Sequence, residues 1–190
     1  MKPWKRLQNT QIIKSNWRCI TVKTFELPDG TEAQFDVFDK DGIEHAGVIA
    51  LTPQKEVVIA EQFRAGPEAV MAEIPGGSVG EAEEPEAAAT RELLEETGYV
   101  PGSIEYMGHV FKDPYMNATW HYFIAYDCMK QTDTQQLDEA EIVNVKHITI
   151  DELLDNANNA RMTDVEAVLL AYERLAKLRG GIEHVTTKNT

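Results

Sequence analysis

The feature that most constrains this chain is an acidic segment, GGSVGEAEEPEAAATRELLEETGYV, at residues 76–100. Seven glutamates fall between Glu81 and Glu96, around a single basic residue, Arg91. Like charges one helical turn apart repel each other by roughly 0.2–0.5 kcal/mol per pair, even on an exposed helix. Two interpretations follow: the segment is a solvated helix face, or its carboxylates form a cradle for divalent metal.

A proline and a glycine mark the two ends of a helix within this segment. Pro85 fits the first turn of a helix and Gly98 fits the position that stops one, which predicts a helix over residues 85–97. One side of this helix should be apolar and pack on a sheet. Its expected residues lie four or seven positions apart: Ala89 with Leu93, and Ala87 with Leu94.

Three glutamates are expected on another side of the same helix. Glu92 and Glu96 are four residues apart and project together, with Glu95 beside them. Carboxylate oxygens suit Mg²⁺ or Mn²⁺, which retain waters and accept substrate phosphates as further ligands. Arg91 can pair with Glu95 at the i, i+4 spacing and hold that carboxylate in orientation. The spacing therefore favours the metal cradle.

The acidic character extends to the whole chain and limits its partners. The 190 residues carry a formal net charge of −14, which argues against a clamp for long DNA or RNA, because such clamps cluster Lys and Arg. A protein this acidic binds a small anionic ligand only where metal ions or a local arginine reverse the field. No apolar run has the length of a membrane span, and we expect a cytoplasmic protein that binds no membrane.

The rest of the chain is predicted to be strand-rich, with two helices near the end. Residues 1–44 are expected to form a small β-element, residues 45–180 the main domain and residues 181–190 a flexible tail. Strands are expected within 16–27, 32–39, 46–52, 56–64, 103–111, 119–129 and 142–150, and helices within 150–158 and 163–181, the last capped by Thr163.

The spacing of the acidic segment matches a known motif. Five residues separate Gly77 from Glu83, and seven more lead to RELLEETGY, the run from Arg91 to Tyr99. This pattern resembles the Nudix box, the signature of a family that hydrolyses nucleoside diphosphates linked to another moiety. Tyr99 is the one departure, since the pattern prefers an aliphatic residue there. The resemblance implies an α/β fold, the Nudix α/β/α sandwich with a mixed sheet, here preceded by the small N-terminal β-element.

The resemblance also implies the roles of residues in and near the box. It implies Mg²⁺ as the cofactor, with Mn²⁺ as a possible substitute. The implied ligands are Glu92, Glu96, the carbonyl of Gly76 and, directly or through water, Glu95, with Arg91 and Glu83 as orienting residues. Glu83 fits equally well as a carboxylate facing the N-terminal dipole of the helix.

The segment before the box resembles one subgroup of the family. EQFRAGPEAVMAEIPGG is similar to the corresponding segment of enzymes that act on ADP-ribose and related nucleoside diphosphate sugars. In that subgroup Arg64 would reach the pyrophosphate, and Glu73 would help to hold metal or the terminal sugar. The alternative interpretation is that Arg64 is an ordinary surface arginine at the end of a strand.

The segment after the box carries two markers that disagree. Pro114, 15 residues past the box, is typical of ADP-ribose hydrolases, whereas a tyrosine near the position of Tyr115 is typical of dinucleoside polyphosphate hydrolases. The run DPYMNATWHYFIA resembles the loop and strand of bacterial nucleoside diphosphate sugar hydrolases. The balance favours a nucleoside diphosphate sugar as the small-molecule substrate.

Hydrolysis also needs a base, because the attacking water must lose a proton. In TQQLDEAEIVNVKHI, a Glu-x-Glu pair falls where related hydrolases carry a catalytic glutamate and a further metal ligand. We assign Glu139 as the base and Glu141 as the ligand, with the exchanged roles left open. The alternative interpretation is a solvated acidic loop without a catalytic role.

The N-terminal strands suggest a homodimer, since in the resembling subgroup they pack against or exchange with a partner. An aromatic from this region often stacks on the nucleobase there, and Trp17 and then Trp4 are the candidates. Two alternatives to a sugar nucleotide hydrolase remain open. One is a hydrolase of dinucleoside polyphosphates or oxidised nucleotides, and the other is a sensor that binds a nucleotide sugar without cleaving it.

The assignment of Glu139 leads to a kinetic prediction. Glu139→Gln should lower turnover by more than about tenfold with little change in substrate affinity, because the change removes a proton acceptor and keeps the shape. Steady-state kinetics of the variant beside Glu141→Gln would measure this. Near-normal turnover of Glu139→Gln would contradict the assignment.

Overall fold

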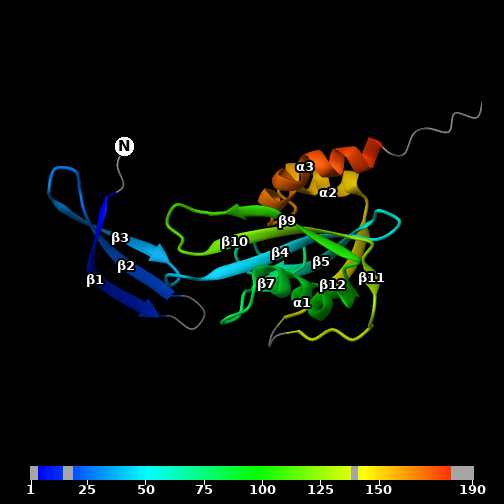
Figure 1. The fold of residues 1–190 in the computed structure, drawn as a ribbon, viewed down its shortest axis with the longest axis horizontal. Coiled ribbons are helices and arrows are strands. Elements are labelled where there is room, and N and C mark those ends of the chain that lie inside the picture. The colour runs from blue at the N-terminus through cyan, green and yellow to red at the C-terminus, as the bar shows by residue number, and fades with distance from the viewer. Residues whose placement is uncertain (1–3, 15–18, 138–140, 181–190) are drawn as a thin grey trace, which may run out of the picture.

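The computed structural model describes residues 4–14, 19–137 and 141–180. The N-terminal sheet has three strands. Figure 1 shows it beside a larger sheet that has helices on both sides. The strands are β1 (Lys5–Lys14), β2 (Cys19–Glu26), β3 (Glu32–Phe38), β4 (Glu44–Leu51), β5 (Val57–Arg64), β6 (Ala69–Met71), β7 (Gly76–Ser78), β8 (Tyr99–Val100), β9 (Ser103–Val110), β10 (Thr119–Tyr126), β11 (Met129–Lys130) and β12 (Asn144–Ile148). The helices are α1 (Pro85–Thr97), α2 (Ile150–Asn158) and α3 (Val165–Gly180).

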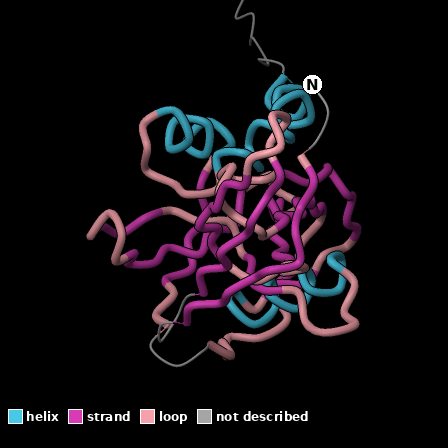
Figure 2. Tube along the Cα trace, turned by 90° about the vertical axis from the view of Figure 1, so that its left-hand side faces the viewer, coloured by secondary structure: helices cyan, strands magenta, loops and turns pink. Residues whose placement is uncertain are grey.

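The larger sheet is mixed and central to the molecule. Its strand order is β12-β5-β4-β10-β9, with β6 and β7 paired to β5 and β4. β4 and β10 run parallel, and the neighbouring pairs run antiparallel. Along β4, Val48 and Ala50 pack towards α1, whereas Ile49 and Leu51 pack towards α2 and α3. Figure 2 shows the strands between the helices. The expected α/β/α sandwich with a mixed sheet is confirmed.

Helix α1 begins and ends where the sequence predicts. Pro85 is its first residue, and Gly98 ends it in the left-handed region at φ 77°. A Cβ on Gly98 would lie 2.1 Å from the carbonyl oxygen of Thr132, so that both the angle and the space require glycine.

The face of α1 that packs on the sheet differs in part from the prediction. Ala89 and Leu93 are fully buried as expected, but Ala87 is exposed and Leu94 is only half-buried. The remaining buried residues of α1 are Ala88, Glu96 and Thr97. At 3.6 residues per turn, Ala87 and Leu94 lie roughly 140–160° around the helix from Ala89, so they fall on the side turned away from the buried stripe.

The N-terminal sheet contains one strand that was not expected, β1, besides the predicted β2 and β3. Leu27 N–H donates to Thr31 O at 2.8 Å across the β2–β3 hairpin, and Gly30 has φ 82°. Two hydrogen bonds tie β3 to the loop before β10: Phe38 N–H to Tyr115 O at 2.7 Å, and Asn117 N–H to Phe38 O at 2.9 Å. Figure 1 shows this sheet projecting from the main body.

The last two helices close one face of the central sheet. At the start of α2, Thr149 Oγ1 accepts from Glu152 N–H at 3.1 Å, and the Glu152 carboxylate accepts from Thr149 N–H at 2.7 Å, which forms a capping box. α3 begins at Val165, so that Asp164 directly precedes it and the predicted cap, Thr163, lies one residue too early. None of the helices in the described ranges is both long and apolar enough to cross a membrane.

Candidate active site

Two adjacent glycines bring strand β7 against helix α1 and strand β4. A Cβ on Gly76 would lie 2.5 Å from Ala46 O, and a Cβ on Gly77 would lie 2.3 Å from Glu92 Oε1. At Gly76 the clash is with backbone, so the close approach to β4 requires glycine, whereas a side chain at position 77 would displace the Glu92 carboxylate. The backbone of β7 therefore lies directly beside the carboxylates of α1.

Arg91 holds several of these carboxylates in place. Its Nη1 donates to Glu92 Oε1 and Glu95 Oε2, each at 2.8 Å. Its Nε donates to Glu83 Oε1 at 2.9 Å, and its Nη2 to Ser78 O at 3.0 Å. The bonds to the three carboxylates, that to Glu83 first, raise the pKa of Arg91 further above its ordinary value. The expected pair with Glu95 is present, within a wider network.

Glu96 lies on the inner side of α1, and its side chain is almost inaccessible to solvent. Its residue is 3% exposed, and its Oε2 accepts a hydrogen bond from Gly76 N–H at 3.1 Å. Burial raises the pKa of Glu96 to about 9. Further carboxylates raise it as well, in the order Glu141, Glu92 and Glu73. This acid is the most strongly perturbed carboxylate of the cluster, and positive charge beside it would restore the ionised form.

The chemistry of this cluster fits a divalent cation. In the parts of the chain that the structure describes, no group of three His, Cys, Asp or Glu side chains is arranged to hold a metal ion. Instead, Glu92 faces Arg91, and burial, the largest cause, raises the pKa of Glu92 too. The donors are nonetheless hard oxygens next to the half-buried glycines of β7, and a cation there would relieve the repulsion between Glu92 and Glu96.

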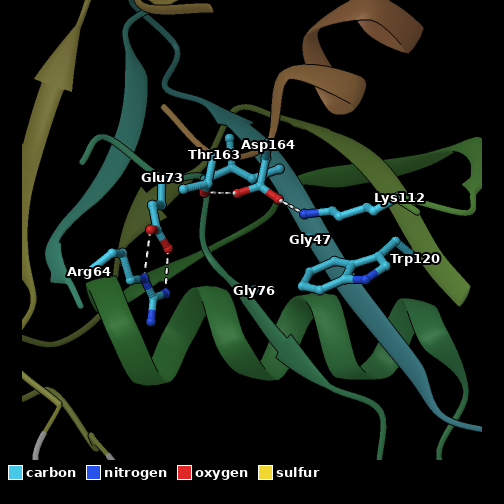
Figure 3. Close-up of a pocket in the computed structure, with 9 residues that line it drawn as sticks. Gly47, Arg64, Glu73, Gly76, Lys112, Trp120, Thr163 and Asp164 are labelled. Carbon is cyan, nitrogen blue, oxygen red and sulfur yellow. Dashed lines mark hydrogen bonds and ion pairs between the residues drawn. The ribbon is translucent and has the colours of Figure 1, made fainter. Parts of the chain in front are cut away.

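A pocket opens beside the carboxylates, and an ion pair forms one of its walls. Arg64, at the end of β5, donates from Nε to Glu73 Oε1 at 2.6 Å and from Nη2 to Glu73 Oε2. Glu73 is 5% exposed, so it fixes the guanidinium from within the protein. The pocket has a volume of about 270 Å³. Figure 3 shows its lining, which includes Arg64, Glu73, Gly76, Lys112, Trp120 and Asp164.

The sequence-predicted residues divide into three groups. Glu141 is half-buried and lies close enough to Arg64, Glu92 and Glu96 to influence the pKa of each. Pro114 and Tyr115 are exposed in a turn and are not among the residues that line the pocket. Trp17 and Glu139 lie outside the described residues. The structure thus brings together Arg64, Glu73, Gly76, Arg91, Glu92, Glu95, Glu96 and Glu141.

Sequence reasoning missed six residues of the pocket wall: Gly47, Ile74, Lys112, Trp120, Thr163 and Asp164. Trp120 belongs to a strand that the sequence predicted, but which face it joins depends on the register of β10 against β4. Asp164 pairs with Lys112 across 52 positions of sequence. No local pattern could have indicated that contact.

Comparisons with known proteins agree with this geometry. The model of the NUDIX domain family matches residues 43–169. The chain is 30% identical over 166 residues to the methanol dehydrogenase activator of Bacillus methanolicus, covering 87% of this chain and 89% of that protein. It is 28% identical over 173 residues to the ADP-ribose pyrophosphatase of Bacillus subtilis (strain 168), covering 90% of this chain and 92% of that protein. The crystal structure of an ADP compounds hydrolase shares the fold, with a TM-score of 0.76 at 19% identity over 92% of this chain and 96% of that one.

The raised pKa of Glu96 predicts how stability depends on pH without metal. The folded-state pKa is about 9 against an ordinary 4.5, so the protonated acid stabilises the fold below about pH 4.5, and this contribution is lost as pH rises towards 9. Calorimetric melting in a chelator should show the midpoint falling over this range. Glu96→Gln should flatten much of the slope, because an amide does not ionise.

Glu86→Gln is the matched control, since Glu86 is an exposed acid in the first turn of the same helix. The melting midpoint of Glu86→Gln should change with pH in the same way as that of the unaltered protein. Equal slopes for Glu96→Gln and the unaltered protein would contradict the prediction.

Proposed function

We propose, on the premise that the chain belongs to the Nudix family, that it hydrolyses the pyrophosphate bond of nucleoside diphosphate sugars such as ADP-ribose or GDP-mannose. It is a Nudix hydrolase related to ADP-ribose pyrophosphatases. The products would be a nucleoside monophosphate and a sugar phosphate. The observation that carries the proposal is the carboxylate cluster of α1 beside a pocket that presents Arg64.

The proposed cofactor is Mg²⁺, with Mn²⁺ as a substitute. When bound, the metal would neutralise the pyrophosphate oxygens and make the attacking water more acidic. Glu92, Glu96 and the carbonyl of Gly76 are the proposed ligands, with Glu141 as a further one. Glu95 would contribute directly or through water, while its bond to Arg91 keeps it oriented.

Arg64 is suited to bind the pyrophosphate. A guanidinium has five N–H donors, and the two bonds to Glu73 occupy two of them. The side chain of Arg64 is 44% exposed at the pocket wall, so the remaining donors are accessible to substrate oxygens. Glu73 supports this task by fixing the plane of the guanidinium.

The proposed reaction is attack of water on one phosphorus atom. Glu139, or Glu141 in the exchanged assignment, takes one proton from the water as the new P–O bond forms. The bond from that phosphorus to the bridging oxygen breaks, and the bridging oxygen leaves with the other phosphate. The two phosphorus atoms thus end in separate monophosphates.

The two curated relatives described above point to different kinds of activity. One name describes cleavage of ADP-ribose, and the other describes an effect on a dehydrogenase. Hydrolysis is the better proposal for this chain because a module that only binds has no need for three clustered glutamates held by Arg91.

The N-terminal sheet supports the proposal of a homodimer. Ile12 and Ile13 of β1 are 48% and 50% exposed, although neighbouring strand residues point to opposite faces. Neither face of β1 is therefore well packed at this point, and a sheet of three strands needs a covered face. Trp4 is 41% exposed and contacts Phe35 with ring centroids 6.0 Å apart. A second copy of the chain is the proposed cover.

Product analysis tests the proposed reaction. Purified protein would be incubated with Mg²⁺ and ADP-ribose, GDP-mannose, ADP-glucose, UDP-glucose, diadenosine polyphosphates or 8-oxo-dGTP. We expect a monophosphate and a sugar phosphate from sugar nucleotides, and none with excess chelator. Glu92→Gln should lower kcat by more than about 100-fold, since even residues behind a metal ligand cost 10- to 100-fold, whereas Glu86→Gln should not.

The other outcomes of the panel separate the alternatives. Cleavage of diadenosine polyphosphates or 8-oxo-dGTP alone would show that these compounds, and not nucleoside diphosphate sugars, are the substrate class. Metal-dependent binding of a sugar nucleotide without any product would indicate a sensor instead of a hydrolase.

Sedimentation equilibrium tests the dimer. The unaltered chain should sediment at twice the mass of one chain, and Ile12→Asp together with Ile13→Asp should shift it towards the monomer. Leu169→Asp is the control, because Leu169 is 75% exposed on α3, away from the N-terminal sheet. A monomeric unaltered chain, or a dimer that survives both aspartates, would contradict this interface.

A further inference from the structure

The pocket has a second wall, opposite Arg64, that none of the proposed roles uses. Figure 3 shows Arg64 and Glu73 on one side, Lys112 and Trp120 on the other, and Gly76 between them. The second wall comes from two connections: Lys112 follows β9, and Thr163 and Asp164 precede α3.

The ammonium group of Lys112 is held in a fixed position. Its Nζ lies 2.8 Å from Asp164 Oδ1 and 3.6 Å from the centroid of the Trp120 ring. Asp164 is in turn fixed by Tyr122, whose hydroxyl donates to Oδ1 at 3.0 Å, and by Thr163, whose hydroxyl donates to Oδ2 at 3.1 Å. An ammonium has three donors, and within the described residues the one hydrogen bond of Lys112 is that to Asp164. Donors therefore remain for a ligand.

Trp120 cannot serve as a platform for a nucleobase. His45 stacks on its ring at 4.3 Å between centroids and 24° between planes, and Lys112 lies 3.6 Å above the ring. The two groups must occupy opposite faces, because on one face they would overlap. Both faces of the indole are thus covered, and its role is to support the ammonium.

The charges of the pocket favour a neutral polar group at this wall. Arg64 is paired with Glu73, and Lys112 with Asp164, so the four side chains sum to no net charge. Each pair still offers donors and acceptors. A phosphate oxygen can only accept and would lie next to the Asp164 carboxylate, whereas a hydroxyl can donate to Asp164 and accept from Lys112.

The size of the pocket is compatible with the same group. Its volume of about 270 Å³ leaves room for a single sugar ring between the two ion pairs.

We propose that Lys112 and Asp164 bind neighbouring hydroxyls of the substrate's sugar, an inference that rests on the proposed function. Lys112 donates to one hydroxyl oxygen, and Asp164 accepts from the adjacent hydroxyl. Arg64 on the opposite wall binds the pyrophosphate, so the sugar lies between the two ion pairs. The nucleobase lies outside this pocket.

A pair of matched substrates tests the proposal. One is ADP-ribose, and the other is ADP esterified with methanol, which keeps the base and pyrophosphate but has no sugar hydroxyls beyond them. Lys112→Met should lower kcat/KM for ADP-ribose about 10- to 100-fold, mostly through KM, and change that for the methyl ester by less than about twofold. Equal losses on both substrates, or no loss on ADP-ribose, would overturn the assignment.

Two further variants separate binding from folding. Lys112→Met leaves Asp164 buried without its cation, so Lys112→Met with Asp164→Asn removes both charges together and should show the same selective loss. Lys146→Met is the control, because Lys146 pairs with Glu61 Oε1 at 2.6 Å on strands β12 and β5 and does not line the pocket. Lys146→Met should leave kcat/KM for both substrates unchanged.

Calorimetric titration with ADP-ribose distinguishes failure of this inference from failure of the proposed function. If the unaltered protein binds ADP-ribose but hydrolyses nothing, the proposed function fails, and a 10- to 100-fold weaker binding by Lys112→Met still supports the sugar site. Equal affinity of the two proteins would overturn the sugar site. Absence of binding of ADP-ribose and of every other sugar nucleotide in the panel to the unaltered protein would overturn both.

Discussion

The ion pairs of Arg91 allow an acidic helix to pack against the central sheet. Repulsion among the glutamates of α1 opposes that packing, and a guanidinium can hold several carboxylates at once because its donors form a rigid fork. Arg91 reaches Glu83 in the loop before α1, and Glu92 and Glu95 on α1 itself. It also donates to Ser78 of β7. One side chain therefore fixes a loop, a strand and a helix relative to one another.

Charge pairing of this kind recurs through the pocket, although the chain as a whole carries −14. Arg64 is fixed by Glu73, and Lys112 by Asp164, with both carboxylates buried. Buried pairs contribute little net stability, but they hold cationic groups in one orientation at the surface of a cavity. The positive groups that an anionic substrate needs are thus placed locally, and the acidic surface does not have to be offset as a whole.

Local sequence signals predicted local structure well. The limits of α1 follow from Pro85 and Gly98, because a fixed φ and a left-handed φ restrict where a helix begins and ends. Contacts between distant segments could not be predicted in this way. β1 lacks clear alternation and is a strand only by pairing with β2, and the pair of Lys112 with Asp164 depends on how β9 and α3 meet. The pocket wall of Lys112 and Asp164 could not be predicted for that reason, whereas the glutamates of α1 could be recognised from their spacing.

The loop between β9 and β10 serves two parts of the molecule at once. Lys112 is the second residue of this loop. A few positions later, Tyr115 and Asn117 make the backbone hydrogen bonds to Phe38 of β3. The joint of the projecting sheet and the wall of the pocket are therefore made from one short piece of backbone. The segment that anchors the N-terminal sheet is therefore continuous with the segment that carries the ammonium of Lys112, so the placement of that sheet and the position of this pocket wall share a few peptide units.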